Sequence, residues 1–107
     1  MKILGVTACP SGVAHTYMAA EALANEAKAL GHEVKVETQG SIGIENEITA
    51  EDVKNADVVI LTKDIAIKNK ERFKGLPIVN VSIADVIKKT NPLLKKVEAY
   101  VKSKQNG

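Results

Sequence analysis

The stretch KILGVTACPSGVAHTYMAAEALANEAKALG, residues 2–31, decides the fold of this 107-residue chain. Its first seven residues are nearly all apolar, which is typical of a strand covered on both faces. Residues 16–30 are rich in alanine and precede Gly31, so they predict a helix with a glycine stop at its C-terminal end. A buried strand that leads through a short loop into a helix is the repeating unit of parallel α/β sheets.

Three further runs rich in valine and isoleucine predict strands at residues 33–38 (EVKVET), 57–62 (DVVILT) and 77–82 (PIVNVS). The first alternates apolar and polar residues, as a strand at a sheet edge would, whereas the other two are nearly continuous in apolar character. Alternation of strands and helices with short connections predicts right-handed crossovers. We therefore predict an α/β fold: a small doubly wound, Rossmann-like domain whose four-stranded parallel sheet has the order 2-1-3-4, with helices on both faces.

Four further helices are predicted from their start signals. Thr49 and Asp52 form an approximate capping box that predicts a helix to about residue 56, and a weaker helix is predicted near residues 65–73. Residues 82–89 predict a short helix, and Pro92 opens a last one that runs to about residue 104. We expect residues 1–107 to form a single domain with a frayed tail at 103–107.

Composition excludes several classes of protein. No apolar run approaches the roughly 18 to 20 residues that cross a bilayer, and the N-terminal apolar stretch is too short for a secretory signal, so we expect a cytoplasmic location. The single cysteine, Cys9, excludes an intramolecular disulfide, CxxC redox chemistry and a multi-cysteine metal site. His15 and His32 are far apart and lack paired carboxylates, so we expect no metal and no cofactor. With three aromatic residues, a nucleic-acid partner is not expected.

Charge is distributed unevenly along the chain. Residues 1–62 hold four lysines and nine acidic residues, whereas residues 63–107 hold eleven basic and four acidic residues. The basic C-terminal half has two interpretations: helical lysines kept in water for solubility, or an electrostatic contact with an acidic or phosphorylated partner.

The loop that leaves the first strand is the candidate site, because ligands of such sheets bind beyond the carboxyl ends of the strands, where strand order reverses. A loop that opens into a helix directs backbone N–H groups and the positive end of the helix dipole toward one point, which favours an anion such as phosphate. The predicted phosphate-binding residues are Pro10, Ser11, Gly12, Val13, Ala14, His15 and Thr16. For His15, a role in orienting the phosphate and a purely structural role at the helix start are both open.

Cys9 stands at the mouth of this loop, where the same N–H groups and dipole favour the thiolate over the thiol. A thiolate that attacks phosphorus forms a phosphocysteine, so Cys9 is the predicted catalytic nucleophile. The alternative is a small buried residue at a strand end. The glycine-containing loop, the helix that follows and the position at the reversal of strand order favour the catalytic role.

The spacing Cys9-x5-His15-Thr16 resembles the C-x5-R-[S/T] loop of low-molecular-weight tyrosine phosphatases, in which an arginine clamps the phosphate. This chain has histidine in that position, and its only arginine, Arg72, lies in another segment. We find no aspartate placed like the general acid of those phosphatases. The sequence therefore lacks the arginine and the general acid that would promote rapid hydrolysis of a phosphocysteine.

A second resemblance covers nearly the whole chain, to about residue 87. The segment CPSGVAHTYMAAEAL resembles the C-P-[TS]-G-[IV]-A-H-T loop and first helix of fructose-type enzyme IIB components of the bacterial phosphoenolpyruvate-dependent sugar phosphotransferase system (PTS). Residues 37–40 (ETQG), residues 56–60 (ADVVI) and Asp64 with Arg72-Phe73 are similar to further motifs of that family. Ser11 stands where threonine is more usual, and the hydroxyl is kept.

The resemblance implies a phosphoryl relay. A cognate IIA component would donate from its phosphohistidine to Cys9, and the phosphocysteine would donate to fructose or a related sugar held in the membrane-embedded IIC component, which would bring this chain to the inner face of the membrane. Gln39, Gly40 and Ser41 would form a second wall of the site or a plain connecting loop. The alternatives are a phosphatase or arsenate-reductase-like hydrolase and a non-catalytic module that senses an anion.

Overall fold

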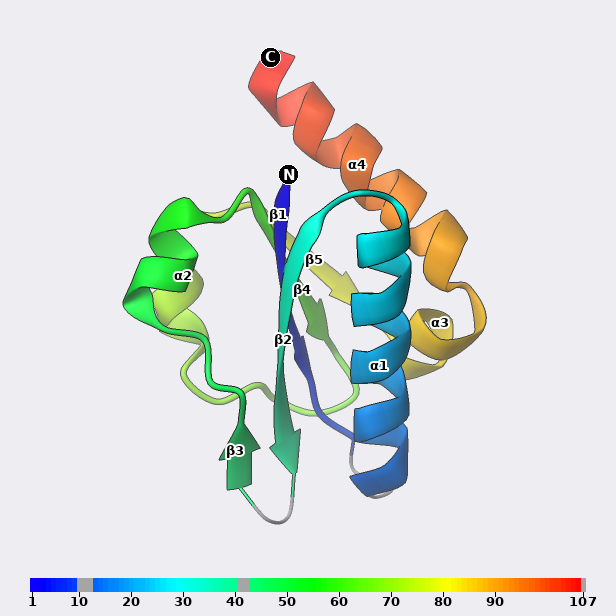
Figure 1. The fold of residues 1–107 in the computed structure, drawn as a ribbon. Helices are drawn as coiled ribbons and strands as arrows, with labels where there is room; N and C mark the ends of the chain where they lie inside the picture. Colours follow the sequence, from blue (N-terminus) through cyan, green and yellow to red (C-terminus); the bar gives the residue numbers. More distant parts are fainter. Residues whose placement is uncertain (10–12, 41–42, 107) are drawn as a thin grey trace.

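The computed structural model describes residues 1–9, 13–40 and 43–106. The strands in this part of the chain are β1 (Lys2–Thr7), β2 (Glu33–Gly40), β3 (Gly43–Glu45), β4 (Val58–Thr62) and β5 (Ile78–Val81). The helices are α1 (Val13–Ala29), α2 (Ala50–Asn55), α3 (Ile83–Lys88) and α4 (Thr90–Asn106), with a short 3₁₀ helix η1 (Lys70–Phe73). Strands and helices alternate along the chain, as the sequence predicts, except where β3 follows β2 and α4 follows α3 (Figure 1).

The sheet has the order β3-β2-β1-β4-β5. The strands β2, β1, β4 and β5 are parallel neighbours, which confirms the predicted order 2-1-3-4 of the four predicted strands. The sequence prediction missed β3, which pairs antiparallel with β2 through Thr38 opposite Glu45 and Gln39 opposite Ile44. The strand has only three residues and a largely exposed face, so it carries no run of apolar residues that would reveal it. Because β3 covers its end, β2 is not the simple edge strand that was predicted.

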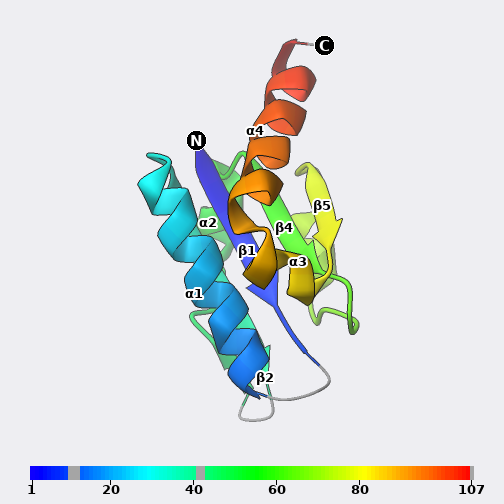
Figure 2. The same cartoon turned by 90° about the vertical axis from the view of Figure 1, so that its right-hand side faces the viewer.

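Helices cover both faces of the sheet, as predicted (Figures 1 and 2). On one face, α1, α3 and α4 enclose the larger apolar core, and on the other face α2 and η1 cover a smaller core that contains Phe73. The alanines of α1 allow close contact with the sheet: Ala19 and Ala27 are fully buried. At Gly5 a side chain would bring its Cβ to 2.7 Å from Cδ2 of Leu23, so any other residue would require the buried Leu23 side chain to shift.

The helix ends follow the local capping chemistry. The Oγ1 of Thr49 accepts a hydrogen bond from the Asp52 amide at 3.1 Å, and the Thr49 amide donates to Oδ2 of Asp52 at 2.9 Å, which confirms the predicted capping box of α2. The hydroxyl of Ser82 caps α3 in the same way through the Asp85 amide. The last helix, predicted to run to about residue 104, extends to Asn106, and buried residues such as Val101 hold its preceding turns on the core.

The weaker helix predicted at residues 65–73 is largely absent, and only η1 at its end is helical. The chain before η1 cannot continue a regular helix because the backbone of Lys68 is hydrogen-bonded to the side chain of Gln39 and Asn69 has a left-handed conformation with φ of 60°. A tertiary contact therefore replaces the local helical hydrogen bonds here. None of the helices in the described ranges is long and apolar enough to cross a membrane.

Candidate functional site

The candidate site lies at the end of the sheet where β1, β2 and β4 finish and α1 begins, the lower end in Figure 1. Cys9 follows β1, is half-buried and packs against the larger core. The predicted phosphate-binding residues Pro10, Ser11 and Gly12 lie outside the described residues, as does Ser41. Of the other predicted phosphate-binding residues, Val13 opens α1, Ala14 and His15 are exposed in its first turn, and Thr16 is buried.

Two buried threonines hold the chain on either side of the loop. The Oγ1 of Thr62, at the end of β4, accepts from the Ala8 amide at 3.0 Å and donates to the Ala8 carbonyl at 3.2 Å. The Oγ1 of Thr7 donates to the carbonyl of Thr16 at 3.0 Å, which joins the end of β1 to the first turn of α1. The residue before Cys9 and the helix after the loop are thereby fixed relative to the sheet.

Sequence reasoning missed the role of these threonines. A signal was present, because the predicted strands that surround the site each contain a threonine at or next to the carboxyl end: Thr7, Thr38 and Thr62. A hydroxyl in that position can hydrogen-bond the backbone of a neighbouring loop. A further contact that the sequence does not reveal is made by Tyr17 of α1, whose hydroxyl donates to the carboxylate of Glu45 in β3.

Gln39, predicted as part of a second wall, is buried at the end of β2. Its Oε1 accepts from the Lys68 amide at 2.9 Å, and its Nε2 donates to the Lys68 carbonyl at 3.1 Å and to Glu37 at 2.8 Å. Both ends of the amide are thus engaged, and they hold the chain after β4 against β2. Gly40 is exposed and pairs with Gly43 in the β2–β3 ladder.

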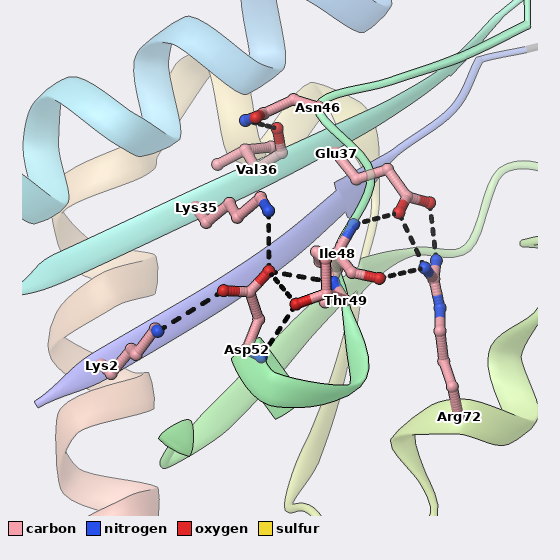
Figure 3. Close-up of polar contacts among 9 residues, drawn as sticks. All are labelled: Lys2, Lys35, Val36, Glu37, Asn46, Ile48, Thr49, Asp52 and Arg72. Carbon is pink, nitrogen blue, oxygen red and sulfur yellow. Dashed lines mark hydrogen bonds and ion pairs between the residues drawn. The ribbon is translucent and has the colours of Figure 1, made fainter. Parts of the chain in front are cut away.

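Glu37 and Arg72 form a buried ion pair beside this contact (Figure 3). Nη1 of Arg72 donates to Oε1 of Glu37 at 2.8 Å and Nη2 donates to Oε2 at 2.6 Å, so the pair is bidentate. Burial alone would raise the pKa of Glu37, but hydrogen bonds from Arg72, Gln39 and the Ile48 amide, with the charge of Arg72, hold that pKa below its ordinary value. Both Nη atoms of the sole arginine in the sequence are therefore engaged with Glu37.

A second charged cluster lies toward the amino end of β1, away from Cys9 (Figure 3). Asp52 of α2 accepts a hydrogen bond from Nζ of Lys35 at 2.7 Å, and Nζ of Lys2 lies 3.7 Å from its other oxygen. The hydrogen bond from Lys35 and those from Thr49 hold the pKa of Asp52 well below its ordinary range. Its position and its capping bonds make this cluster structural: it secures α2 on the sheet.

Two hollows on the surface of the described residues bear on the position of the site. The larger, about 620 Å³, lies between β5 and α4 and touches neither Cys9 nor its neighbours. The smaller, about 360 Å³, lies beyond the end of β4 and is lined by Thr62, whose hydroxyl binds Ala8. Proximity to the thiol, and not size, makes the smaller hollow the one relevant to the site. Within the same ranges no group of three or more His, Cys, Asp or Glu side chains could hold a metal ion.

The arrangement suits nucleophilic chemistry on an anion. A half-buried thiol precedes the N-terminal end of a 17-residue helix, and the dipole of a helix favours negative charge near that end. The threonine contacts fix the thiol at the boundary between strand and helix, which limits the reorganisation needed when charge develops.

Comparison with known proteins identifies close relatives. Residues 4–96 match the family model described as "PTS system, Lactose/Cellobiose specific IIB subunit". The chain is 67% identical over 100 residues to the fructose-like EIIB component 2 of the PTS of Escherichia coli K12, with 94% of each chain covered. It is 46% identical over 95 residues to the fructose-specific EIIABC component of Bacillus subtilis, covering 89% of this chain and 15% of that protein.

A solved structure agrees with these matches. A domain of the fructose-specific IIABC component from Borrelia burgdorferi superposes with a TM-score of 0.84 at 53% identity, covering 89% of this chain and 90% of that one. Sequence and fold therefore point to the same set of relatives.

Proposed function

The chain belongs to the fructose-type IIB components of the bacterial sugar phosphotransferase system, a family of phosphotransferases, and on that premise we propose that Cys9 is the residue that carries the phosphoryl group. The observation that supports this proposal most directly is the position of the only thiol in the sequence, between the end of β1 and the start of α1. The proposal takes residues 1–107 as one IIB domain in which the loop from Pro10 to Thr16 holds the phosphoryl group.

The proposed cycle has two transfers. The thiolate of Cys9 attacks the phosphorus of a phosphohistidine on a IIA component whose other ring nitrogen is protonated. The S–P bond forms while the P–N bond breaks, and the histidine leaves as a neutral imidazole that keeps this proton. A sugar hydroxyl bound to a IIC component then attacks the phosphorus. The O–P bond forms, the S–P bond breaks, the hydroxyl proton passes to a base, and the thiolate of Cys9 is restored.

The N-terminal end of α1 stabilises the charge on the transferred group in both steps. Val13, Ala14 and His15 in its first turn supply backbone N–H groups, and the His15 imidazole orients the phosphoryl oxygens. Thr16 acts mainly through its backbone, because its carbonyl accepts the Thr7 hydroxyl and its side chain is buried. Gln39 and Gly40 border the site from β2, with Gln39 in a supporting role.

The partners follow from the family. A fructose-specific relative carries IIA, IIB and IIC in one chain, so this chain is proposed to work between a IIA donor and a IIC acceptor in the cytoplasm, at the inner face of the membrane during sugar transfer. Fructose or a closely related sugar is the proposed substrate, because the relatives are named for fructose. A hydrolase is disfavoured, because the guanidinium of Arg72 binds Glu37 and is not available to clamp a phosphate.

The proposal is tested by incubating the protein with labelled phosphoenolpyruvate, the general phosphotransferase proteins and a IIA component, and by mapping the label. We expect the label on Cys9. Its stability toward acid and base should identify an S–P bond, and the label should persist until sugar and IIC are added. Cys9→Ser should take no label while keeping its circular dichroism spectrum, because an alcohol is a far weaker nucleophile at neutral pH. Rapid release of inorganic phosphate, or label at another residue in folded Cys9→Ser, would overturn it.

A matched variant examines the loop. His15→Ala should slow phosphorylation without abolishing it, because the exposed imidazole assists an anion that backbone N–H groups already hold. An unchanged rate would assign His15 a structural role only.

A further inference from the structure

The chain that follows β4 forms a basic rim beside the candidate site. Residues 63–74 contain five basic and two acidic residues. The charge of Arg72 is balanced by its ion pair with Glu37. The Oδ1 of Asp64 accepts a hydrogen bond from the Ile83 amide at the start of α3, at 2.8 Å. Lys63 and Lys70 are exposed and line the 360 Å³ hollow. Asp64 also lines the hollow, and a backbone amide does not cancel its charge, but the two lysines outnumber it and leave the hollow with a net positive charge.

The rim is close to the thiol and is fixed in place. Thr62, which also lines the hollow, hydrogen-bonds both backbone groups of Ala8, the residue before Cys9. The Lys63 amide donates to the Val81 carbonyl at 2.8 Å, so the start of the rim is still part of the sheet. Further along, the backbone of Lys68 is held by Gln39. The lysines thus project from an ordered border of the site.

Apolar atoms lie between the two lysines. Ile65 is 39% exposed, unusually open for its type, and lines the hollow together with the half-buried Ile67. The lining of the hollow is more polar than apolar, and isoleucines beside lysines give it the mixed composition of a transient protein–protein interface. The hollow is thus suited to a protein partner more than to a free ion.

We propose that Lys63, Ile65 and Lys70 dock the phosphorylated IIA donor through acidic residues beside its phosphohistidine, an inference that rests on the proposed function. Charge decides between the two partners. A phosphoryl group brings close to two negative charges at neutral pH, and acidic neighbours would complement the lysines. Cytoplasmic loops of membrane proteins carry an excess of Lys and Arg, so the cytoplasmic face of the IIC acceptor would be repelled. The rim is accordingly selective for the first transfer.

The test reverses the two charges and measures each transfer separately. In Lys63→Glu/Lys70→Glu, the second-order rate of transfer from phosphorylated IIA to Cys9 should fall about ten-fold or more at low ionic strength, and less than about three-fold in 0.5 M salt. The control Lys102→Glu/Lys104→Glu changes net charge equally on exposed residues of α4, at the opposite end of the molecule from the carboxyl ends of the strands (Figure 1). Its rate should stay within about two-fold of the unmodified protein.

The second transfer is measured with pre-phosphorylated protein, membrane vesicles containing IIC, and sugar. Here the rim variant should match the unmodified protein within about two-fold. Equal donor rates for the rim and control variants would overturn the docking surface, and so would slowing confined to the sugar step. If the charge-reversed variant misfolds, Lys63→Gln/Lys70→Gln replaces it. This variant should show about half the decrease in the logarithm of the donor transfer rate. Failure of the unmodified protein to take label would instead refute the proposed function.

Discussion

Replacement of Glu37 by glutamine tests the buried ion pair that joins β2 to the chain after β4. The carboxylate is fully buried and accepts four hydrogen bonds: two from Arg72, one from Gln39 and one from the Ile48 amide. A glutamine side chain has one oxygen in place of two, and its NH₂ group would face these donors. Glu37→Gln therefore leaves a buried guanidinium without its counter-charge.

The expected loss of unfolding free energy is about 3 to 5 kcal/mol, the usual cost of removing one member of a buried ion pair. With a urea m-value of about 1.5 kcal/mol per molar, the denaturation midpoint should fall by roughly 2 to 3 M. If Glu37→Gln does not fold, Arg72→Lys keeps the charge but loses the bidentate geometry, and should cost about half as much. Urea titration followed by circular dichroism measures both variants.

The effect depends on pH in a defined direction. The folded-state pKa of Glu37 lies below its ordinary value of 4.5, so ionised Glu37 stabilises the fold fully above that pH. This contribution is lost as pH falls through the lowered folded-state pKa. The difference between the unmodified protein and Glu37→Gln should consequently be largest near neutral pH and shrink below pH 4.5.

The double variant Glu37→Met/Arg72→Met is the control for the ion pair. This variant removes both charges together and fills the site with apolar atoms. It should therefore lose clearly less stability than the losses of Glu37→Met and Arg72→Met added together. The reasoning is refuted if Glu37→Gln costs less than about 1 kcal/mol, or if the single losses are additive in the double variant.

Three further substitutions test other contacts. Thr49→Ala removes the N-cap hydroxyl of α2 and should lower the free energy of unfolding by about 1 kcal/mol in urea titration, with Thr49→Ser as the near-neutral control. Gly5→Ala should cost about 1 to 3 kcal/mol, because its Cβ would lie 2.7 Å from Cδ2 of Leu23; a thermal midpoint unchanged from the parent protein would contradict this close packing. Thr62→Val removes both hydrogen bonds to Ala8 and should lower stability by about 1 to 3 kcal/mol and slow phosphorylation; loss of stability alone would deny Thr62 a positioning role.

The sequence predicts most of the architecture because its signals are local. The apolar runs of β1 and β4, the alanine-rich α1 and the capping box at Thr49 each specify their element through short-range propensity and patterning. The order of the four parallel strands follows from right-handed connections between them. The short strand β3 has no such signal, because its three residues are defined only by hydrogen bonds to β2.

At the candidate site, too, some features can be predicted from the sequence and others depend on tertiary contacts. By itself, the sequence determined which residue is the candidate nucleophile, because one cysteine follows the first strand and precedes a helix. Only the tertiary structure decided the roles of Gln39 and Arg72. Gln39 holds the backbone of Lys68 and Arg72 pairs with Glu37, across separations of 29 and 35 residues. Such contacts depend on which strands become neighbours, and no local pattern in a single sequence records them.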